Sequence, residues 1–71
     1  MQRYVILIEA TPSGYSTYSP DLPGCVATAP TRAEVEQVMR EAIEFHLDGL
    51  RADGQPIPPA STSASYVEVA A

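Results

Sequence analysis

Residues 31–52 read TRAEVEQVMREAIEFHLDGLRA, and this stretch predicts one long amphipathic helix. Its start carries a capping box, in which the Thr31 hydroxyl accepts from the amide three residues on and Glu34 reaches back to the cap. Asp53-Gly54 supplies a C-cap, and the prolines that follow prevent the helix from continuing. We interpret the charged side of the helix as an ordinary solvated face. The large apolar residues recur at i, i+3 and i+4 spacing and predict one buried stripe: Val35, Val38, Met39, Ala42, Ile43, Leu47 and Leu50.

Short strand patterns lie on either side of this helix. Tyr4–Ile8 is apolar at every position, which predicts a central strand with both faces covered. A turn over residues 11–14 joins it to Tyr15–Tyr18 in a hairpin, and Cys25–Ala29 offers a short third strand of small residues. Ser65–Val69 alternates and predicts a last strand. The order is therefore β-β-β-α-β in one small α+β domain, with an antiparallel sheet and one long helix packed on it.

The segment between the second and third strands predicts a tight turn. Its two prolines lack a backbone donor, and its glycine accepts a φ that other residues resist. The motif comprises Pro20, Asp21, Pro23, Gly24 and Cys25. A bend in the chain explains Asp21, Pro23 and Gly24 without any binding function.

Composition and charge exclude several classes of function. The 71 residues include nine acidic and four basic side chains, all of the basic ones arginine, and the formal net charge is −5. Scattered arginines do not form the cationic patch that neutralises phosphates, so we expect no direct nucleic-acid binding by this chain alone. An acidic surface instead favours encounter with a basic partner. The single cysteine, the lack of a long apolar run and an N-terminus unlike a signal peptide indicate a cytoplasmic protein that does not use a membrane.

Residues able to carry catalysis are few. His46 is the only histidine and lies near the middle of the apolar stripe, so we expect it to face the sheet or a subunit interface. Cys25 could be a nucleophile activated by His46, but a small buried strand thiol is the simpler interpretation. A minimal magnesium-dependent nuclease would need Glu9, Asp21 and Glu68 together, and their positions look dispersed. The sequence therefore predicts no enzyme, no cofactor and no metal site.

Several stretches of the chain resemble the HicB-like antitoxin family. They are Tyr18-Ser19-Pro20-Asp21-Leu22-Pro23-Gly24-Cys25, Thr31-Arg32-Ala33-Glu34, Ala42-Ile43-Glu44-Phe45-His46-Leu47 and Gly54-Gln55-Pro56-Ile57-Pro58-Pro59. The resemblance covers nearly the whole chain, and a turn of this kind at a fixed distance before a Thr-x-x-Glu helix start is fairly specific. It implies a partial ribonuclease-H-like fold, which agrees with the strand and helix order predicted above.

The resemblance also implies a function. Family members pair with a small basic HicA-like toxin that cleaves messenger RNA using a histidine, and they neutralise it by covering that site. The chain would then be the antitoxin of a type II toxin–antitoxin system. Many relatives carry a further C-terminal DNA-binding module, whereas this sequence ends at Ala71 after its last predicted strand. We therefore expect a HicB-like antitoxin domain over residues 1–71 and no separate DNA-binding domain.

Surfaces that bind partners are predicted from residue type. Exposed tyrosines beside a turn commonly serve in interfaces, which places Tyr15, Tyr18 and Asp21 near a binding surface. A domain of this size has a thin stability margin, and an apolar strand needs cover on both faces, so we expect a homodimer or higher homo-oligomer. The alternative function is an orphan HicB-like oligomeric or ligand-binding module without a toxin partner.

Overall fold

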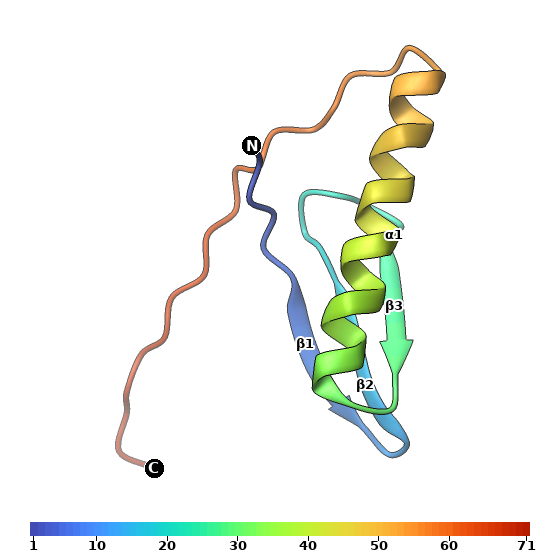
Figure 1. Ribbon diagram of the computed structural model, residues 1–71. Coiled ribbons are helices and arrows are strands. Elements are labelled where there is room, and N and C mark those ends of the chain that lie inside the picture. The colour runs from blue at the N-terminus through green and yellow to red at the C-terminus, as the bar shows by residue number, and fades with distance from the viewer.

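The structure is a computed structural model that describes residues 1–71. Three antiparallel strands, β1 (Leu7–Thr11), β2 (Gly14–Tyr18) and β3 (Val26–Ala29), precede one helix, α1 (Arg32–Ala52). The sheet order is β1-β2-β3, and α1 packs on one face of the sheet over β2 and β3 (Figure 1). The predicted α+β class, a single small domain with an antiparallel sheet and one long helix, is confirmed.

Helix α1 begins and ends where its capping residues predict. The Glu34 amide donates to Thr31 Oγ1 over 3.1 Å, and Thr31 has the extended backbone of an N-cap. At the other end Gly54 adopts a φ of 68°. Its amide and the next one along donate to carbonyls of the last helical turn. This Schellman arrangement satisfies the end of the helix and turns the chain back toward the sheet.

The core lies between α1 and the turn that precedes β3. Leu22, Val35 and Met39 are fully buried, and Cys25 is 5% exposed. Only 6 of the 71 residues are buried, so the core is thin even for a small domain. The predicted apolar stripe is wrong at Val38, which is 41% exposed because it lies on a flank of α1 outside the core cluster.

The first strand differs from its prediction in its bounds and in its place in the sheet. β1 begins at Leu7, and residues 4–6 form an extended lead-in whose Tyr4 and Ile6 side chains pack against the core. The prediction of a central strand is wrong, because β1 pairs only with β2 and lies at an edge of the sheet. The apolar run Tyr4–Ile8 therefore borders an open edge of the sheet.

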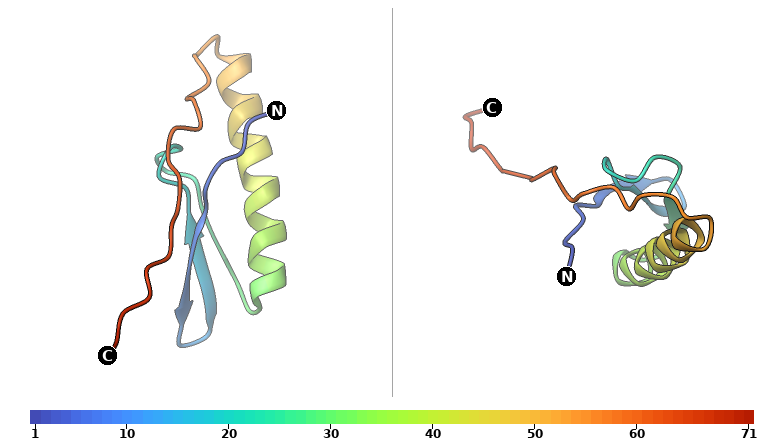
Figure 2. Two further views of the ribbon diagram at one scale, coloured as in Figure 1. Left: turned by 90° about the vertical axis from the view of Figure 1, so that its left-hand side faces the viewer. Right: turned by 90° about the horizontal axis from the view of Figure 1, so that it is seen from above.

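The predicted last strand, Ser65–Val69, is not formed within this chain. Residues 56–71 make no backbone–backbone hydrogen bond and contain no helix or strand. This segment returns from the top of α1 past the N-terminal residues and then runs away from the sheet (Figures 1 and 2). We name residues 63–71 the C-terminal tail. Its alternating pattern has no neighbouring strand to pair with in the same chain.

Candidate partner-binding surfaces

Two successive backbone turns build the motif before β3. The Leu22 amide donates to the Ser19 carbonyl, and the Cys25 amide donates to the Leu22 carbonyl, each over 3.1 Å. Pro23 and Gly24 form the centre of the second turn, where Gly24 has the φ of 82° that a type II turn requires. The two turns bring Leu22 and Cys25 into the core beneath α1.

Asp21 has its binding partners inside the chain. Its two carboxylate oxygens accept four hydrogen bonds of 2.8–3.1 Å from the amides and hydroxyls of Ser61 and Thr62. These bonds, led by the one from the Thr62 amide, lower the pKa of Asp21 below its ordinary value. The carboxylate thus fastens the chain immediately before the C-terminal tail.

The sheet face opposite α1 carries a row of exposed apolar side chains. The strand register places Leu7 opposite Tyr18 and Tyr18 opposite Val26, so the three lie side by side across the sheet. Their exposed fractions are 37%, 42% and 65%. On the other face Thr17 is buried and Ala27 packs against the core. We name Leu7, Tyr18 and Val26 the open-face row.

One flank of α1 combines carboxylates with exposed apolar side chains. Val38 and Phe45 are 41% and 82% exposed, and their spacing of seven places them on the same side of the helix. Three acidic residues at positions 34, 41 and 48 alternate with them at three- and four-residue steps. We name this surface the acidic flank, and it comprises Glu34, Val38, Glu41, Phe45 and Asp48.

A shallow hollow beside the acidic flank brings Cys25 and His46 to one place. Both residues line it, together with Phe45 and Gly49 of α1. His46 is half-buried, whereas Cys25 is almost inaccessible. Burial raises the pKa of the Cys25 thiol, which disfavours the thiolate that nucleophilic attack needs. The hollow therefore favours the interpretation of Cys25 as a core residue.

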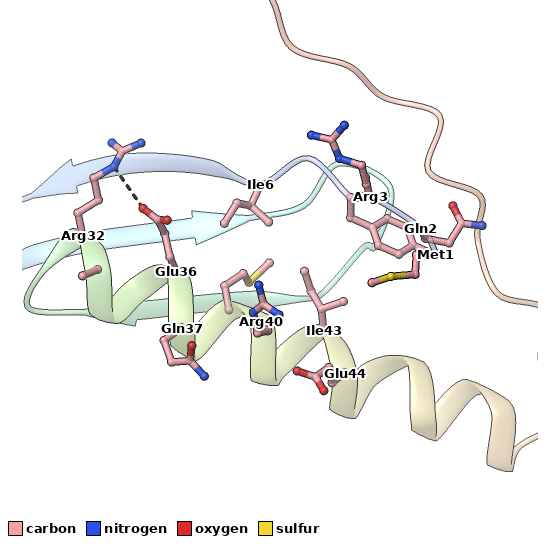
Figure 3. Close-up of a pocket in the computed structure, with 13 residues that line it drawn as sticks. Met1, Gln2, Arg3, Ile6, Arg32, Glu36, Gln37, Arg40, Ile43 and Glu44 are labelled. Carbon is pink, nitrogen blue, oxygen red and sulfur yellow. Dashed lines mark ion pairs between the residues drawn. The ribbon is translucent and has the colours of Figure 1, made fainter.

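The other flank of α1 faces β1 across an open groove. The groove exists because α1 lies over β2 and β3 and leaves β1 largely uncovered. Figure 3 shows Ile6 and Ile43 directed toward each other across it, and the buried Met39 also lines it. Arg32 forms an ion pair with Glu36 at 3.4 Å (Figure 3). Three of the four arginines of the chain line this groove: Arg3, Arg32 and Arg40.

The residues predicted to bind a partner do not share one surface. Tyr18 belongs to the open-face row, Tyr15 lies half-buried on the face that α1 covers, and Asp21 holds Ser61 and Thr62. The three carboxylates of the nuclease alternative are also apart, on β1, in the turn and in the C-terminal tail. No three histidine, cysteine, aspartate or glutamate side chains gather as metal ligands would. The one helix falls short of the length of apolar sequence that crossing a membrane requires.

Comparison with known proteins identifies the group to which this architecture belongs. Residues 4–70 match the family described as "HicB_like antitoxin of bacterial toxin-antitoxin system". The chain belongs to the HicB-like antitoxin family. The family resemblance predicted from the turn, the helix start and the helix is therefore confirmed.

Individual relatives of this HicB-like chain are consistent with that assignment. A 14.9 kDa protein of the rep-hol intergenic region of Haemophilus phage HP1 is 34% identical over 64 residues, which are 90% of this chain. The chain spans 48% of that relative's length. A UPF0150 protein of Synechocystis is 38% identical over 57 residues, with coverage of 79% of this chain and 72% of the relative.

A solved structure resembles this HicB-like chain along most of its length. It is a chain of the "HicA3 and HicB3 toxin-antitoxin complex", with a TM-score of 0.70 and 32% sequence identity. The match covers 87% of this chain and 70% of the other. Family and structure together connect the chain with toxin–antitoxin systems.

Sequence reasoning missed two of the surfaces of this HicB-like chain. A helical projection that included Phe45 would have placed it with Glu41 and Asp48 rather than with the core stripe, so the acidic flank could have been found. The open-face row depends on the strand register, which pairs Leu7 with Tyr18 and Tyr18 with Val26. The turn over residues 11–14 fixes the pairing of Leu7 with Tyr18, but no tight turn joins β2 to β3 and specifies the pairing of Tyr18 with Val26.

Proposed function

We propose that this chain is the antitoxin of a type II toxin–antitoxin system and that it binds and neutralises a HicA-like, mRNA-cleaving toxin in the cytoplasm. The observation that carries the proposal is the family match over residues 4–70, supported by the likeness to a chain of the HicA3–HicB3 complex. The chain acts by covering its partner, and its own residues carry no chemistry.

The acidic flank is the surface that best fits a small basic toxin. Its three carboxylates outnumber the one arginine paired with them, Arg51, which contacts Asp48 at 3.0 Å, and the net local charge of −2 favours encounter with a cationic partner. Phe45 is 82% exposed and Val38 41%, although both are apolar. Aromatic side chains that become buried near the centre of an interface contribute much of its binding energy. Phe45 is therefore the expected anchor, and the carboxylates around it accelerate association.

The test begins with affinity capture of the tagged chain from its native cells. The chain is an antitoxin if a small basic protein is recovered in stoichiometric amount, arrests growth when expressed alone, and no longer does so when this chain is co-expressed. If the chain captures only itself, the alternative of an orphan HicB-like oligomeric or ligand-binding module replaces the antitoxin proposal.

A pair of variants tests the assigned surface. Phe45→Ala should weaken toxin binding by about 30-fold or more, since hot-spot truncations cost about 2 kcal/mol or more. Thr28→Ala is the control, because Thr28 is exposed on the opposite sheet face and lies outside the acidic flank. Equal affinities of the two variants, measured by calorimetry, would move the toxin site elsewhere and direct attention to Tyr18, which keeps its predicted partner-binding role as a proposal.

We also infer that the protein associates with itself as a dimer or higher oligomer. The core contains only a few buried residues, and both faces of β1 retain apolar side chains in partial contact with solvent. A second copy that covers such surface would stabilise the fold.

A further inference from the structure

We propose that Ser65–Val69 of one copy adds to the open edge of β1 in a second copy as a fourth strand. In this pairing Tyr66 and Glu68 enter the groove between β1 and α1 of the second copy. Val67 and Val69 then lie beside the open-face row. The proposal deepens the self-association inferred above and rests on it, but it does not depend on the presence of a toxin.

The first argument is the conflict between the sequence of the first strand and its place in the sheet. Tyr4–Ile8 has the uninterrupted apolar character of a strand with both faces covered, yet β1, which begins at Leu7, lies at an edge of the sheet and leaves Leu7 37% exposed. Exposed edges are normally protected by proline, lysine or a very short strand. Residues 4–11 contain neither proline nor lysine, and their one charged side chain is Glu9. A proline follows each edge strand at once, Pro12 after β1 and Pro30 after β3, but β3 has four residues and β1 has five. β1 is thus the longer edge available to an added strand.

The second argument is that the C-terminal tail is a strand without a partner. Tyr66, Val67 and Val69 are 95%, 82% and 76% exposed, and the tail makes no backbone–backbone hydrogen bond. Val67 and Val69 alternate with Glu68, so a strand formed here would have one apolar face. Ser65–Val69 has five residues, the same number as β1. Each chain therefore carries one donor strand and one acceptor edge, so two identical copies satisfy both.

The third argument is that the tail is directed away from its own sheet. Pro58 accepts a hydrogen bond from the Tyr4 hydroxyl, and the Ala60 amide donates to Gln2 Oε1 over 3.2 Å. Asp21 then holds Ser61 and Thr62 through four hydrogen bonds. Beyond these contacts the tail diverges from β1, as two perpendicular views show (Figures 1 and 2). The contacts place the donor strand on the β1 side of the molecule and project it toward another copy.

Side-chain chemistry selects which face of the incoming strand meets the groove. Ile6, Met39 and Ile43 give the groove an apolar lining that suits the ring of Tyr66. The three arginines that line it exceed its two glutamates by one, which suits the single carboxylate of the tail, Glu68. Val67 and Val69 would point to the other side of the strand, where Leu7 begins the open-face row.

The exposed surface is large enough to support such an interface. A compact monomer of 7.6 kDa exposes roughly 4,300 Å² by the usual scaling with mass, whereas this chain exposes 5507 Å². The excess of roughly 1,200 Å² exceeds the area of about 800 Å² that each partner buries in a stable interface. The radius of gyration is 13.8 Å, whereas a compact domain of this length has about 11 Å. It is larger because the C-terminal tail runs away from the rest of the chain.

The experiment measures the mass of the 71-residue chain in solution by light scattering, with two tail variants. We expect the unmodified chain to have twice the 7.6 kDa chain mass. Because one of any two successive amides in a strand faces a given neighbour, the double variant Val67→Pro/Glu68→Pro removes a ladder donor in the middle of the proposed strand. It should reduce the mass by half, with helical circular dichroism unchanged. Ala71→Pro places a proline outside the strand and should leave the dimer intact. Isotope-filtered NMR on a mixture of labelled and unlabelled copies should show contacts from Tyr66 to Ile43 between chains.

Each other outcome contradicts a different part of the inference. A monomeric unmodified chain would overturn both the self-association and the strand exchange. A dimer that persists in Val67→Pro/Glu68→Pro would leave the self-association standing and overturn the exchange. Contacts between Tyr66 and Ile43 within one chain only would show that the tail folds back onto its own β1, and they would overturn the exchange as well. Toxin binding, tested separately through Phe45, is unaffected by any of these results.

Discussion

Two valines of α1 offer a sharp test of which side of the helix forms the core. Val35 and Val38 stand one turn apart, and the sequence pattern assigns both to the buried stripe. In the structure Val35 is fully buried, whereas Val38 is 41% exposed. The same substitution, valine to alanine, can be made at both positions in one helix. Any intrinsic gain in helix propensity is then common to both variants and cancels in their difference.

The magnitude follows from burial. Valine exceeds alanine by two methylene equivalents, or about 1.6 kcal/mol of transfer free energy at about 0.8 kcal/mol for each buried methylene. At Val35 the enclosed void adds to this loss, and the propensity gain of alanine offsets part of it, so we expect about 2 kcal/mol of destabilisation. At Val38 the smaller burial and the same propensity gain leave about 0.5 kcal/mol or less. The total stability expected for 71 residues is only about 4–11 kcal/mol, so the first loss is a substantial part of it.

Urea unfolding followed by circular dichroism at a fixed protein concentration measures both variants. We expect the midpoint of Val35→Ala to fall well below that of Val38→Ala, with similar slopes. Equal losses, or a larger loss at Val38, would mean that α1 is rotated about its axis relative to the structure. The acidic flank would then not exist as a surface, because Val38 and Phe45 share one side of the helix.

Three further perturbations test individual features of the fold. Thr17→Val should stabilise the chain by about 1 kcal/mol, because the buried Thr17 hydroxyl has no hydrogen-bond partner. Thermal unfolding measures this gain, and the exposed control Thr28→Val should show none. Gly14→Ala should destabilise it by about 1–3 kcal/mol in the same assay, because a Cβ at Gly14 would lie 2.4 Å from the Ala29 carbonyl oxygen; a neutral result would place β3 farther from the hairpin. Because the pKa of Asp21 is lowered, the stabilisation from its hydrogen bonds is fully present above the ordinary pKa of 3.8 and is lost as pH falls through the folded-state pKa. The NMR resonance of the Ser61 amide, which donates to Asp21, should therefore titrate below pH 3.8. Asp21→Asn should abolish that titration.

The amino-acid sequence by itself determined the elements whose signals are local. Thr31 and Glu34 mark the start of α1 and Gly54 marks its end, because capping depends on side chains within a few residues of the helix terminus. The turn chemistry of Pro23 and Gly24 is equally local, and so is that of residues 11–14, which predicted the hairpin strand Tyr15–Tyr18; the structure contains both the turn and the strand. The family resemblance drew on the same stretches.

Only the tertiary structure decided which strands are neighbours and which side chains remain uncovered. The run Tyr4–Ile8 predicts a central strand, but whether a strand has a second neighbour depends on the rest of the chain, and here no segment reaches it. Ser65–Val69 has the pattern of a strand, yet a strand exists only where an edge can accept its hydrogen bonds, and Asp21 holds the preceding residues in a direction that leads away from the sheet. Pairing between strands that no tight turn joins, and contacts over 40 residues of sequence, are long-range events that local patterns do not encode.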